Sequence, residues 1–336
     1  MTRDRIATPH TGARGARLLG LGAYRPRRTV ENDEVCAPIG DVDPEWVLAR
    51  SGIRTRRFAG PDETLVGMAA AAADDALAAA GATVATVDAV LVATMSPDTV
   101  CPQVATRVAD RLGTSAAAID VGAACSGFCT ALELAGALVR GGTSSHVLVV
   151  GVERMTDLLD PTDRSTAFLF GDGAGAVLVG PGEEAGVGPV VWGSDGAQAD
   201  LIVHAPAEDA GPDGLPGLRM QGPAVFRWAS TQIAPVAEKA LAAAGVGVDD
   251  LGAFVPHQAN NRITDALARA LALPAHVTVA RDVVTTGNTS AASVPLAMHA
   301  LLADGDARPG DLALLAGFGA GLTYAAQVVA LPPISS

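Results

Sequence analysis

The sequence predicts an α/β fold built from two similar halves, stacked as layers of helix, sheet, helix, sheet and helix. Apolar runs that suit buried strands alternate with Ala-rich helical stretches along the chain. The hexapeptide ALAAAG occurs at residues 76–81 and again at 240–245, 164 residues later. The repeat continues without a gap into the apolar runs at 87–93 and 251–257. Apolar strands joined by helices indicate sheets covered on both faces, so we expect a duplicated domain.

A second pair of similar stretches supports the duplication and places the boundary between the halves. GDGAG at 171–175 and GFGAG at 317–321 each precede an apolar strand. We therefore assign residues 15–180 to the first half and 181–336 to the second. Residues 1–14 are basic and lack an apolar segment, so we expect a flexible extension and no signal peptide.

The individual elements follow from the apolar runs and from the Ala-rich stretches between them. Strands in the first half are expected at 16–24, 87–95, 117–122, 146–152 and 175–180, with helices at 65–81 and 101–113. Strands in the second half are expected at 252–257, 312–318 and 322–331, with a long helix at 224–245. The stretch 195–216 is rich in Gly, Pro and Asp, which predicts an irregular surface segment.

Composition limits the classes of function. Of the 336 residues, 49% are hydrophobic and 18% charged, which supports a sizeable core and argues against disorder. A formal net charge of −13 disfavours nucleic-acid binding. The sequence lacks an apolar run near the ~20 residues that span a bilayer, so we expect a cytoplasmic protein without a membrane segment. The four cysteines form no CxxC pair or zinc-like cluster, so we expect free thiols and no metal.

The stretch DVGAACSGFCTAL, residues 120–132, joins a predicted strand to a predicted helix and carries Cys125 at the junction. Free N–H groups and the positive dipole end of a helix favour a thiolate there, with a pKa between about 3.5 and 7.5 instead of about 8.5. The small neighbours of Cys125 leave room for a substrate carbonyl. The sequence thus predicts an activated nucleophile; the competing interpretation is a small buried hydrophobe, which we expect for Cys129.

Two further strand-to-helix junctions carry polar side chains. His257, in FVPHQANNRI, follows a predicted strand, whereas His204, His276 and His299 have no such setting. Asn288, in TTGNTSAASVP, precedes an Ala-rich helix. By itself such an Asn is typical of a helix cap. However, it lies 163 residues after Cys125, close to the repeat distance, so the duplication places both at equivalent junctions that converge on one pocket.

Two glycine-rich stretches lead to opposite predictions. Residues 18–26 begin like a dinucleotide-binding fingerprint but lack its third glycine and contain Pro26, so we do not expect NAD. GFGAG at 317–321 favours a tight turn whose backbone N–H groups point into the site, as an oxyanion hole requires.

Five stretches together resemble the β-ketoacyl-acyl carrier protein synthase III family, within the thiolase-like fold. They are GAACSGF, DPTDRSTAFLFGDGAGAV, VPHQANNRI, GNTSAASVP and GFGAGLTYA, and the resemblance covers nearly the whole chain from Arg17 on. It implies a homodimer with a duplicated five-layered α/β/α/β/α fold. It also implies catalytic roles for Cys125, His257 and Asn288, and an oxyanion hole formed by the backbone N–H groups of Cys125 and Ala320.

Binding residues are likewise implied by the resemblance. Contacts to the adenine and phosphates of coenzyme A match Trp46, Arg50 and Arg164, and those to the pantetheine arm match Phe226 and Asn260. Docking of the carrier protein matches Arg227, Arg262 and Arg269; a further basic position of the family is Ala270 in this chain.

The implied reaction is a ping-pong decarboxylative condensation without a cofactor. Cys125 takes an acyl group from acyl-coenzyme A, and malonyl-acyl carrier protein then enters. His257 and Asn288 stabilise the enolate formed as CO2 leaves. The product starts either fatty acid or polyketide synthesis. An acyltransferase acting on an amine or alcohol is the alternative; such relatives often lose the Asn, so Asn288 favours condensation.

The acyl pocket is also implied by the resemblance. In this family the residue before the proline in SPDTVCPQV reaches the partner subunit's pocket, and it is a bulky Phe in members that prefer acetyl groups. This chain has Cys101, which predicts space for a larger primer, branched or of medium length, unless Leu169 or Phe170 fills it.

Overall fold

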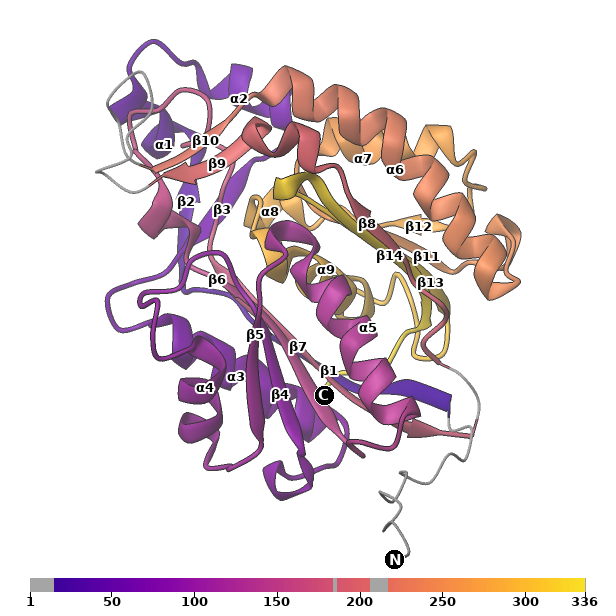
Figure 1. Ribbon diagram of the computed structural model, residues 1–336. Helices are drawn as coiled ribbons and strands as arrows, with labels where there is room; N and C mark the ends of the chain where they lie inside the picture. The colour runs from indigo at the N-terminus through magenta and orange to yellow at the C-terminus, as the bar shows by residue number, and fades with distance from the viewer. Residues whose placement is uncertain (1–14, 184–185, 206–216, 336) are drawn as a thin grey trace, which may run out of the picture.

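The computed structural model describes residues 15–183, 186–205 and 217–335, and its core is two five-stranded sheets (Figure 1). The first sheet has the order β1 (Gly15–Tyr24), β7 (Gly173–Gly182), β6 (Val147–Glu153), β4 (Ala89–Ala93) and β5 (Ala117–Val121). The second has the order β8 (Val191–Ser194), β14 (Thr323–Ala330), β13 (Leu312–Phe318), β11 (Ala253–Pro256) and β12 (Thr278–Val279). When the strands of each sheet are numbered along the chain, the two sheets have the same strand order.

The pairing directions repeat as well. In each sheet the three strands at one end are parallel, and the other two join antiparallel. The duplication expected from ALAAAG is confirmed by this order, but the second similarity is not a structural match. Glu153 pairs with Gly173 in one sheet and Phe318 with Tyr324 in the other. Thus the first glycine stretch, 171–175, corresponds in place to 322–326 and not to GFGAG.

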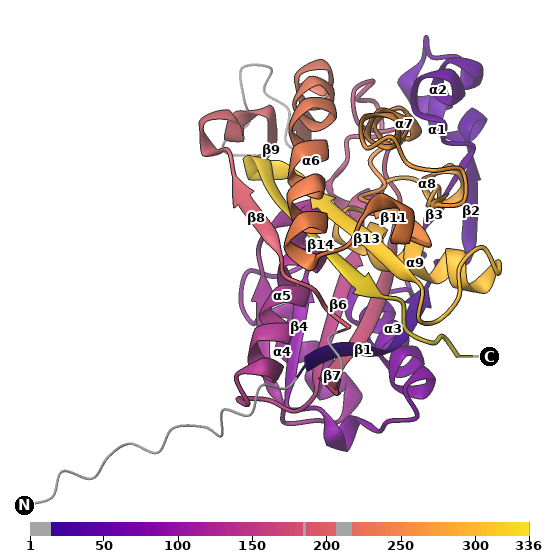
Figure 2. The same cartoon turned by 90° about the vertical axis from the view of Figure 1, so that its right-hand side faces the viewer.

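Helices complete the five layers, as Figures 1 and 2 show. The outer face of the first sheet is covered by α3 (Leu65–Ala79) and α4 (Val104–Leu112), and that of the second by α6 (Gly222–Ala244) and α7 (Asn261–Ala270). Between the sheets lie α5 (Gly127–Arg140) and α9 (Ser293–Ala303), which contact strands of both. These two helices are rich in Ala and small residues because they are packed between two sheets.

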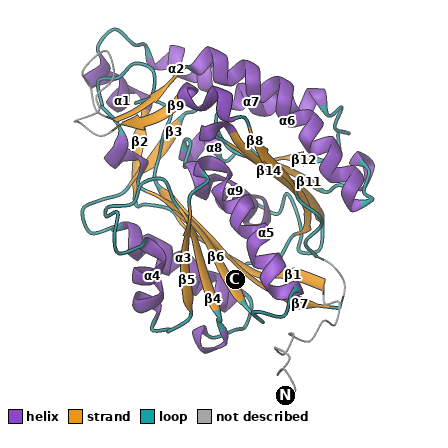
Figure 3. Ribbon diagram, viewed as in Figure 1, coloured by secondary structure: helices purple, strands orange, loops and turns teal. Residues whose placement is uncertain are grey.

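Several short elements were not predicted (Figure 3). They form a cap over one end of the first half: β2 (Arg28–Glu31), β3 (Thr55–Phe58), α1 (Asn32–Ile39), α2 (Pro44–Ser51) and α8 (Val283–Thr286). Each is at most eight residues long, too short for a clear periodic pattern. A separate apolar cluster holds the cap together.

The glycines of residues 18–26 serve packing, which agrees with the rejection of a dinucleotide site. They lie on β1, where a Cβ at Gly20 or Gly22 would approach the backbone of α3 to 2.4 and 2.3 Å. No side chain fits there, so α3 packs directly on the strand.

The segment 195–216 is only partly irregular. Residues 196–201 form a 3₁₀ turn, and β9 (Ile202–Ala205) pairs with β10 (Gly217–Met220). The rest, 206–216, lies outside the described residues, as does the expected extension 1–14. In the described part of the chain, no helix is long and apolar enough to cross a membrane.

Candidate active site

Three chain junctions meet between the two sheets. Cys125 lies in a 3₁₀ turn, Ala124–Ser126, between β5 and α5. Asn288 precedes a second 3₁₀ turn, Ser290–Ala292, which leads into α9 and contacts the first turn. His257 follows β11 directly and reaches Ser293, the first residue of α9. The structure therefore brings together the three residues that the sequence singled out.

Close backbone contact at these junctions explains their small residues. A Cβ added at Gly319 would lie 2.6 Å from the Cys125 Cβ, and one at Gly151 would lie 2.4 Å from the Ala291 carbonyl oxygen. Ser126 and Gly127 are themselves buried. Small side chains are thus needed first for the packing of the two turns, and not only for the approach of a substrate, as the sequence had suggested.

The surroundings of Cys125 favour its neutral thiol form. Its side chain is only 8% exposed, and burial raises its pKa to about 12, with a further increase from the Glu153 carboxylate. The nearby Ser290 hydroxyl and the N–H groups of Cys125 and Ala320 lower this pKa in turn. Desolvation thus opposes the thiolate that the sequence predicts, because burial disfavours the charged form.

The surroundings of His257 favour its neutral imidazole form. Burial lowers its pKa to about 3, and its ring packs edge-on against Phe318 with centroids 5.2 Å apart. Its Nδ1 lies 2.7 Å from Ser293 Oγ, which also accepts the Gln258 N–H at 3.4 Å. Ser293 Oγ can donate its hydroxyl proton to Nδ1, and a neutral imidazole bonded in this way carries its proton on Nε2. A neutral histidine of this tautomer donates a hydrogen bond through Nε2.

Asn288 is oriented by its own turn. Its Oδ1 accepts the Ser290 N–H at 2.9 Å, while its backbone is clamped to the segment 169–171 by hydrogen bonds of 2.8 and 3.1 Å. Among the described residues Nδ2 donates no hydrogen bond, so it is available to a ligand. The helix-cap interpretation does not apply, because the Asn288 side chain caps a turn before α9 and not the helix itself.

The GFGAG turn lies directly against the nucleophile. Gly319 contacts Cys125, and the next amide, that of Ala320, is one of the two that reach the sulfur. Thr323 and Ser126 fix this arrangement: their hydroxyls are 2.8 Å apart, and Thr323 donates to Ala123 or Ala320 carbonyls at 3.1 and 3.0 Å. Two backbone donors thus converge at Cys125, one from each half of the chain.

Comparison with known proteins agrees with this geometry. The family model for the C-terminal part of 3-oxoacyl-[acyl-carrier-protein] synthase III matches residues 241–331, and the model for synthase III itself matches 119–196. The β-ketoacyl-[acyl-carrier-protein] synthase III 1 of Streptomyces coelicolor is 52% identical, over 96% of this chain and 98% of that protein. The chain belongs to the 3-oxoacyl-acyl carrier protein synthase III family.

Solved structures show the same similarity. A priming β-ketosynthase from a polyketide biosynthetic pathway matches with a TM-score of 0.93 at 47% identity, over 99% of this chain and all of that one. Synthase III from Pseudomonas aeruginosa matches with a TM-score of 0.89 at 41% identity, over 96% and 100%. The thiolase-like fold and a condensing acyltransferase activity are thereby established for the chain.

The residues expected to hold coenzyme A lie on the cap and on the outer helices. The Arg164 guanidinium lies 5.5 Å from the Trp46 ring centroid, and Arg50 is exposed near the end of α2. Phe226 on α6 is covered by the Arg262 guanidinium at 5.4 Å. Asn260 caps α7 by accepting the Ile263 N–H at 3.1 Å. Trp46 and Arg164 are thus brought together, whereas the Asn260 side-chain oxygen already has a structural partner.

The three residues expected around the acyl group fall into two places. Leu169 and Phe170 are buried, and Phe170 forms a bridge with Asn288, beside the catalytic turn. Cys101 is exposed in the loop between β4 and α4, next to Val100. Cys101 is thus open to solvent, whereas Leu169 and Phe170 are buried.

The arginines expected to dock a carrier protein are on the outer helices of the second half. Arg227 lies on α6, and Arg262 and Arg269 lie on α7, and all three are exposed. Unlike Arg281, which pairs with Asp265 at 2.7 Å, they form no ion pair with the described carboxylates.

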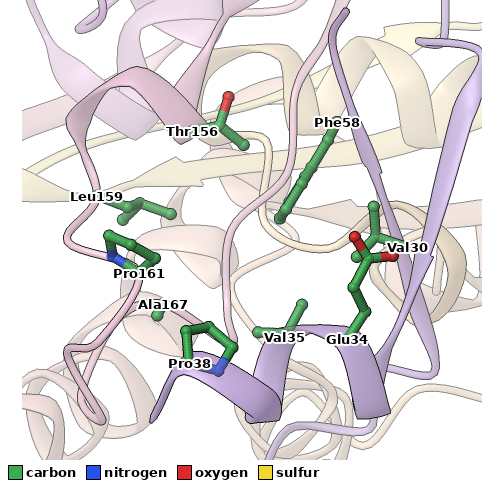
Figure 4. A pocket seen from close by; sticks show the side chains of 9 residues that line it. All are labelled: Val30, Glu34, Val35, Pro38, Phe58, Thr156, Leu159, Pro161 and Ala167. Carbon is green, nitrogen blue, oxygen red and sulfur yellow. The ribbon is translucent and has the colours of Figure 1, made fainter.

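A separate pocket of about 270 Å³ lies beside α1 (Figure 4). Its lining is mainly apolar and includes Val35, Pro38, Phe58 and Leu159, with Glu34 at one side. None of the predicted site residues lines it, so it is distinct from the junctions at Cys125.

Sequence reasoning missed three polar residues of the site: Ser290, Ser293 and Glu153. The two serines stand in GNTSAAS, within reach of the motif that was recognised. Glu153 follows an apolar strand, at its carboxyl end, as His257 does. A search for polar residues at the carboxyl ends of apolar strands would therefore have identified Glu153 as well as His257.

Proposed function

We propose that this chain catalyses the first condensation of a chain-building pathway, joining an acyl-coenzyme A primer to malonyl-acyl carrier protein. The observation that carries the proposal is the convergence on one buried thiol of two backbone donors, a neutral histidine and a free Asn amide. A thiol supplies the acyl-enzyme, two amides bind its oxyanion, and two side-chain donors bind an enolate oxygen.

In the first half-reaction, Cys125 Sγ attacks the primer thioester, and coenzyme A leaves. The oxyanion of the tetrahedral intermediate lies between the N–H groups of Cys125 and Ala320. In the second, malonyl-carrier protein loses CO2, and His257 Nε2 and Asn288 Nδ2 donate to the enolate oxygen. The carbanion then attacks the acyl carbonyl and releases Cys125. The neutral state of His257 suits this role, since it donates without needing to be charged.

Trp46, Arg50 and Arg164 are proposed to hold the nucleotide of coenzyme A, and Phe226 and Asn260 to line the path of its pantetheine arm. The unpaired arginines Arg227, Arg262 and Arg269 provide a basic face on an acidic chain, which suits an acidic carrier protein.

The homodimer is proposed through the free edge of the first sheet. Among the described strands β5 pairs only with β4, and its Ile119 side chain is 48% exposed. Val100, in the loop that also carries Cys101, is 99% exposed. An edge strand of this kind has unpaired backbone N–H and C=O groups that can form hydrogen bonds with a strand of another chain. A second copy paired there would also bring Cys101 towards the partner's acyl pocket.

The test separates the two half-reactions. Purified protein is incubated with acetyl-, isobutyryl- or hexanoyl-coenzyme A, and mass spectrometry of its peptides should show the acyl group on Cys125 and none on Cys129. Malonyl-acyl carrier protein is then added, and a β-ketoacyl product with release of CO2 should follow. Transfer of the acyl group to an added amine or alcohol without release of CO2 would instead support the acyltransferase alternative.

A further inference from the structure

Glu153 is a fully buried carboxylate next to the nucleophile, at the carboxyl end of β6. Five donors surround it: the N–H groups of Met95 at 3.1 Å, Ser96 at 3.1 Å and Ala291 at 3.3 Å, and the hydroxyls of Ser96 at 2.5 Å and Thr94 at 3.0 Å. These donors come from the end of β4 and from the turn that follows Asn288. The carboxylate therefore anchors the loop after β4 to the turn that follows Asn288.

Among the residues that the structure describes, no cationic side chain forms an ion pair with this carboxylate. The neighbouring guanidinium, Arg154, is turned away to Asp157 at 2.8 Å and to the Glu63 carbonyl at 2.8 Å. Asp172, next to the residue that pairs with Glu153, is turned to Ala59 and Thr156. The β4 end and the Ser290–Ala292 turn present only Thr, Met, Ser and Ala. The charge of Glu153 raises the pKa of Cys125.

Ser290 connects the two groups. Its hydroxyl oxygen is buried without a hydrogen-bond partner of good geometry, yet it is close enough to both Cys125 and Glu153 to lower the pKa of each. Its backbone is held at φ 44°, an unusual value for a residue with a side chain. Its hydroxyl lies near both a thiol and a carboxylate, and a hydroxyl can pass a proton between two such groups because it donates and accepts at once.

We propose that Glu153 takes up the thiol proton of Cys125 through the Ser290 hydroxyl during acylation and returns it during condensation. This inference rests on the proposed function. It answers a question that the catalytic residues leave open: a buried thiol must lose its proton, and a histidine whose pKa is about 3 is a poor acceptor near neutral pH. Burial raises the pKa of Glu153 to about 7, the range in which a base is most effective.

The proton that Cys125 loses in the first half-reaction returns to it in the second. In acylation the S–H bond breaks, its proton moves to Ser290 Oγ, and the serine proton moves to Glu153. The S–C bond forms, and coenzyme A leaves as a thiolate that takes a proton from water. In condensation CO2 leaves, the new C–C bond forms, and the Cys125 sulfur departs as a thiolate. It receives the stored proton from Glu153 by the same path.

The experiment measures proton uptake during one acylation turnover, with a pH indicator in weakly buffered solution. The proteins are the native chain, Glu153→Gln, Ser290→Ala and, as a matched control, Asp172→Asn, which removes another buried carboxylate. Above pH 7 the native enzyme should show a transient uptake of about one proton per acyl group formed, because coenzyme A takes a proton from water before the buried Glu153 returns its proton to solvent. Glu153→Gln and Ser290→Ala should take up none, and Asp172→Asn should behave like the native enzyme.

The pH profile of the acylation rate gives a readout that a purely structural role would not change. In the native enzyme and in Asp172→Asn, the rate should rise through the pKa of Glu153, about 7. Glu153→Gln and Ser290→Ala should lose that step and acylate about 10²-fold more slowly at pH 8. Ser290→Ala keeps the carboxylate, so it tests the path even if Glu153→Gln folds poorly.

Two results would overturn the proton path. One is a native enzyme that forms acyl-Cys125 without proton uptake; the other is a slow Ser290→Ala enzyme that keeps the native pH step. Failure of the proposed function looks different, since no acyl-enzyme would then form with any primer.

Discussion

The two 3₁₀ turns at the centre of the molecule have the same backbone and different chemistry. Ala124 and Ser290 both have φ 44°, and each begins a turn that leads into a helix of the central layer, α5 or α9. Aligned on these residues, Cys125 corresponds to Ala291, and Asn288 corresponds to Gly122. Cys125 and Asn288 thus lie at matching junctions, as the duplication predicts, but three positions apart within the matched turns.

The difference shows what a duplicated fold provides. The repeat supplies two matched junctions that face each other, and each half contributes one amide to Cys125. The side chains have then diverged, so that one turn carries the nucleophile and the other carries the Asn donor and the serines. The loops before the outer helices differ in the same way: after β11 the chain places His257 inside, whereas after β4 a longer loop exposes Cys101.

The strongest prediction tests whether the nucleophile can move between the turns. Cys125→Ala should abolish acyl-enzyme and lower condensation by at least about 10³-fold. Adding Ala291→Cys to that variant should not restore it, because the Ala320 amide faces only the first turn. Labelling by acyl-coenzyme A with mass spectrometry is the measurement. Recovery in the double variant would show that the two turns are chemically interchangeable.

The second prediction concerns the donor of the other turn. Asn288→Ala should still form acyl-Cys125 at a rate near that of the native enzyme. Malonyl decarboxylation and condensation should fall by about 10²–10³-fold, as expected for loss of one oxyanion donor. The two half-reactions are followed by coenzyme A release and by CO2 release. Equal losses in both would assign Asn288 to the folding of its turn.

The third prediction compares the outer helices of the two halves. Arg262→Glu on α7 should raise the KM for malonyl-carrier protein about tenfold at low salt and less at high salt. Acylation by a small acyl-coenzyme A should stay nearly unchanged. Arg111→Glu on α4, the corresponding helix of the first half, makes the same change of charge and should leave that KM unaltered. A similar effect of both variants would mean that total charge, and not the α7 face, attracts the carrier protein.

The smallest expected effect concerns primer choice at the exposed loop. If Cys101 leaves space in the partner's pocket, the native enzyme should prefer isobutyryl- or hexanoyl- to acetyl-coenzyme A, with up to about fourfold for each buried methylene. Cys101→Phe should shift the preference towards acetyl. Competition between the three primers in the first half-reaction is the measurement, and an unchanged order in the variant would assign the pocket to Leu169 and Phe170 alone.

The sequence by itself determined the α/β class, the duplication, the long strands and helices, and the three residues Cys125, His257 and Asn288. These features are local: apolar runs, an Ala-rich repeat and polar residues at strand ends can be read in order along the chain. The short cap elements escaped because four to eight residues carry no clear period.

Only the tertiary structure decided the states of the catalytic groups. A helix terminus predicts a lowered pKa and a thiolate at Cys125. Burial between two sheets and a neighbouring carboxylate instead raise the pKa of this thiol. The same burial keeps His257 neutral, and Ser293, 36 positions away, places its proton on Nε2. Glu153 and Ser290 are separated by 137 positions and become neighbours of Cys125 only when the halves close. Desolvation and contacts of this kind depend on what surrounds a residue in space, which its sequence neighbours do not specify.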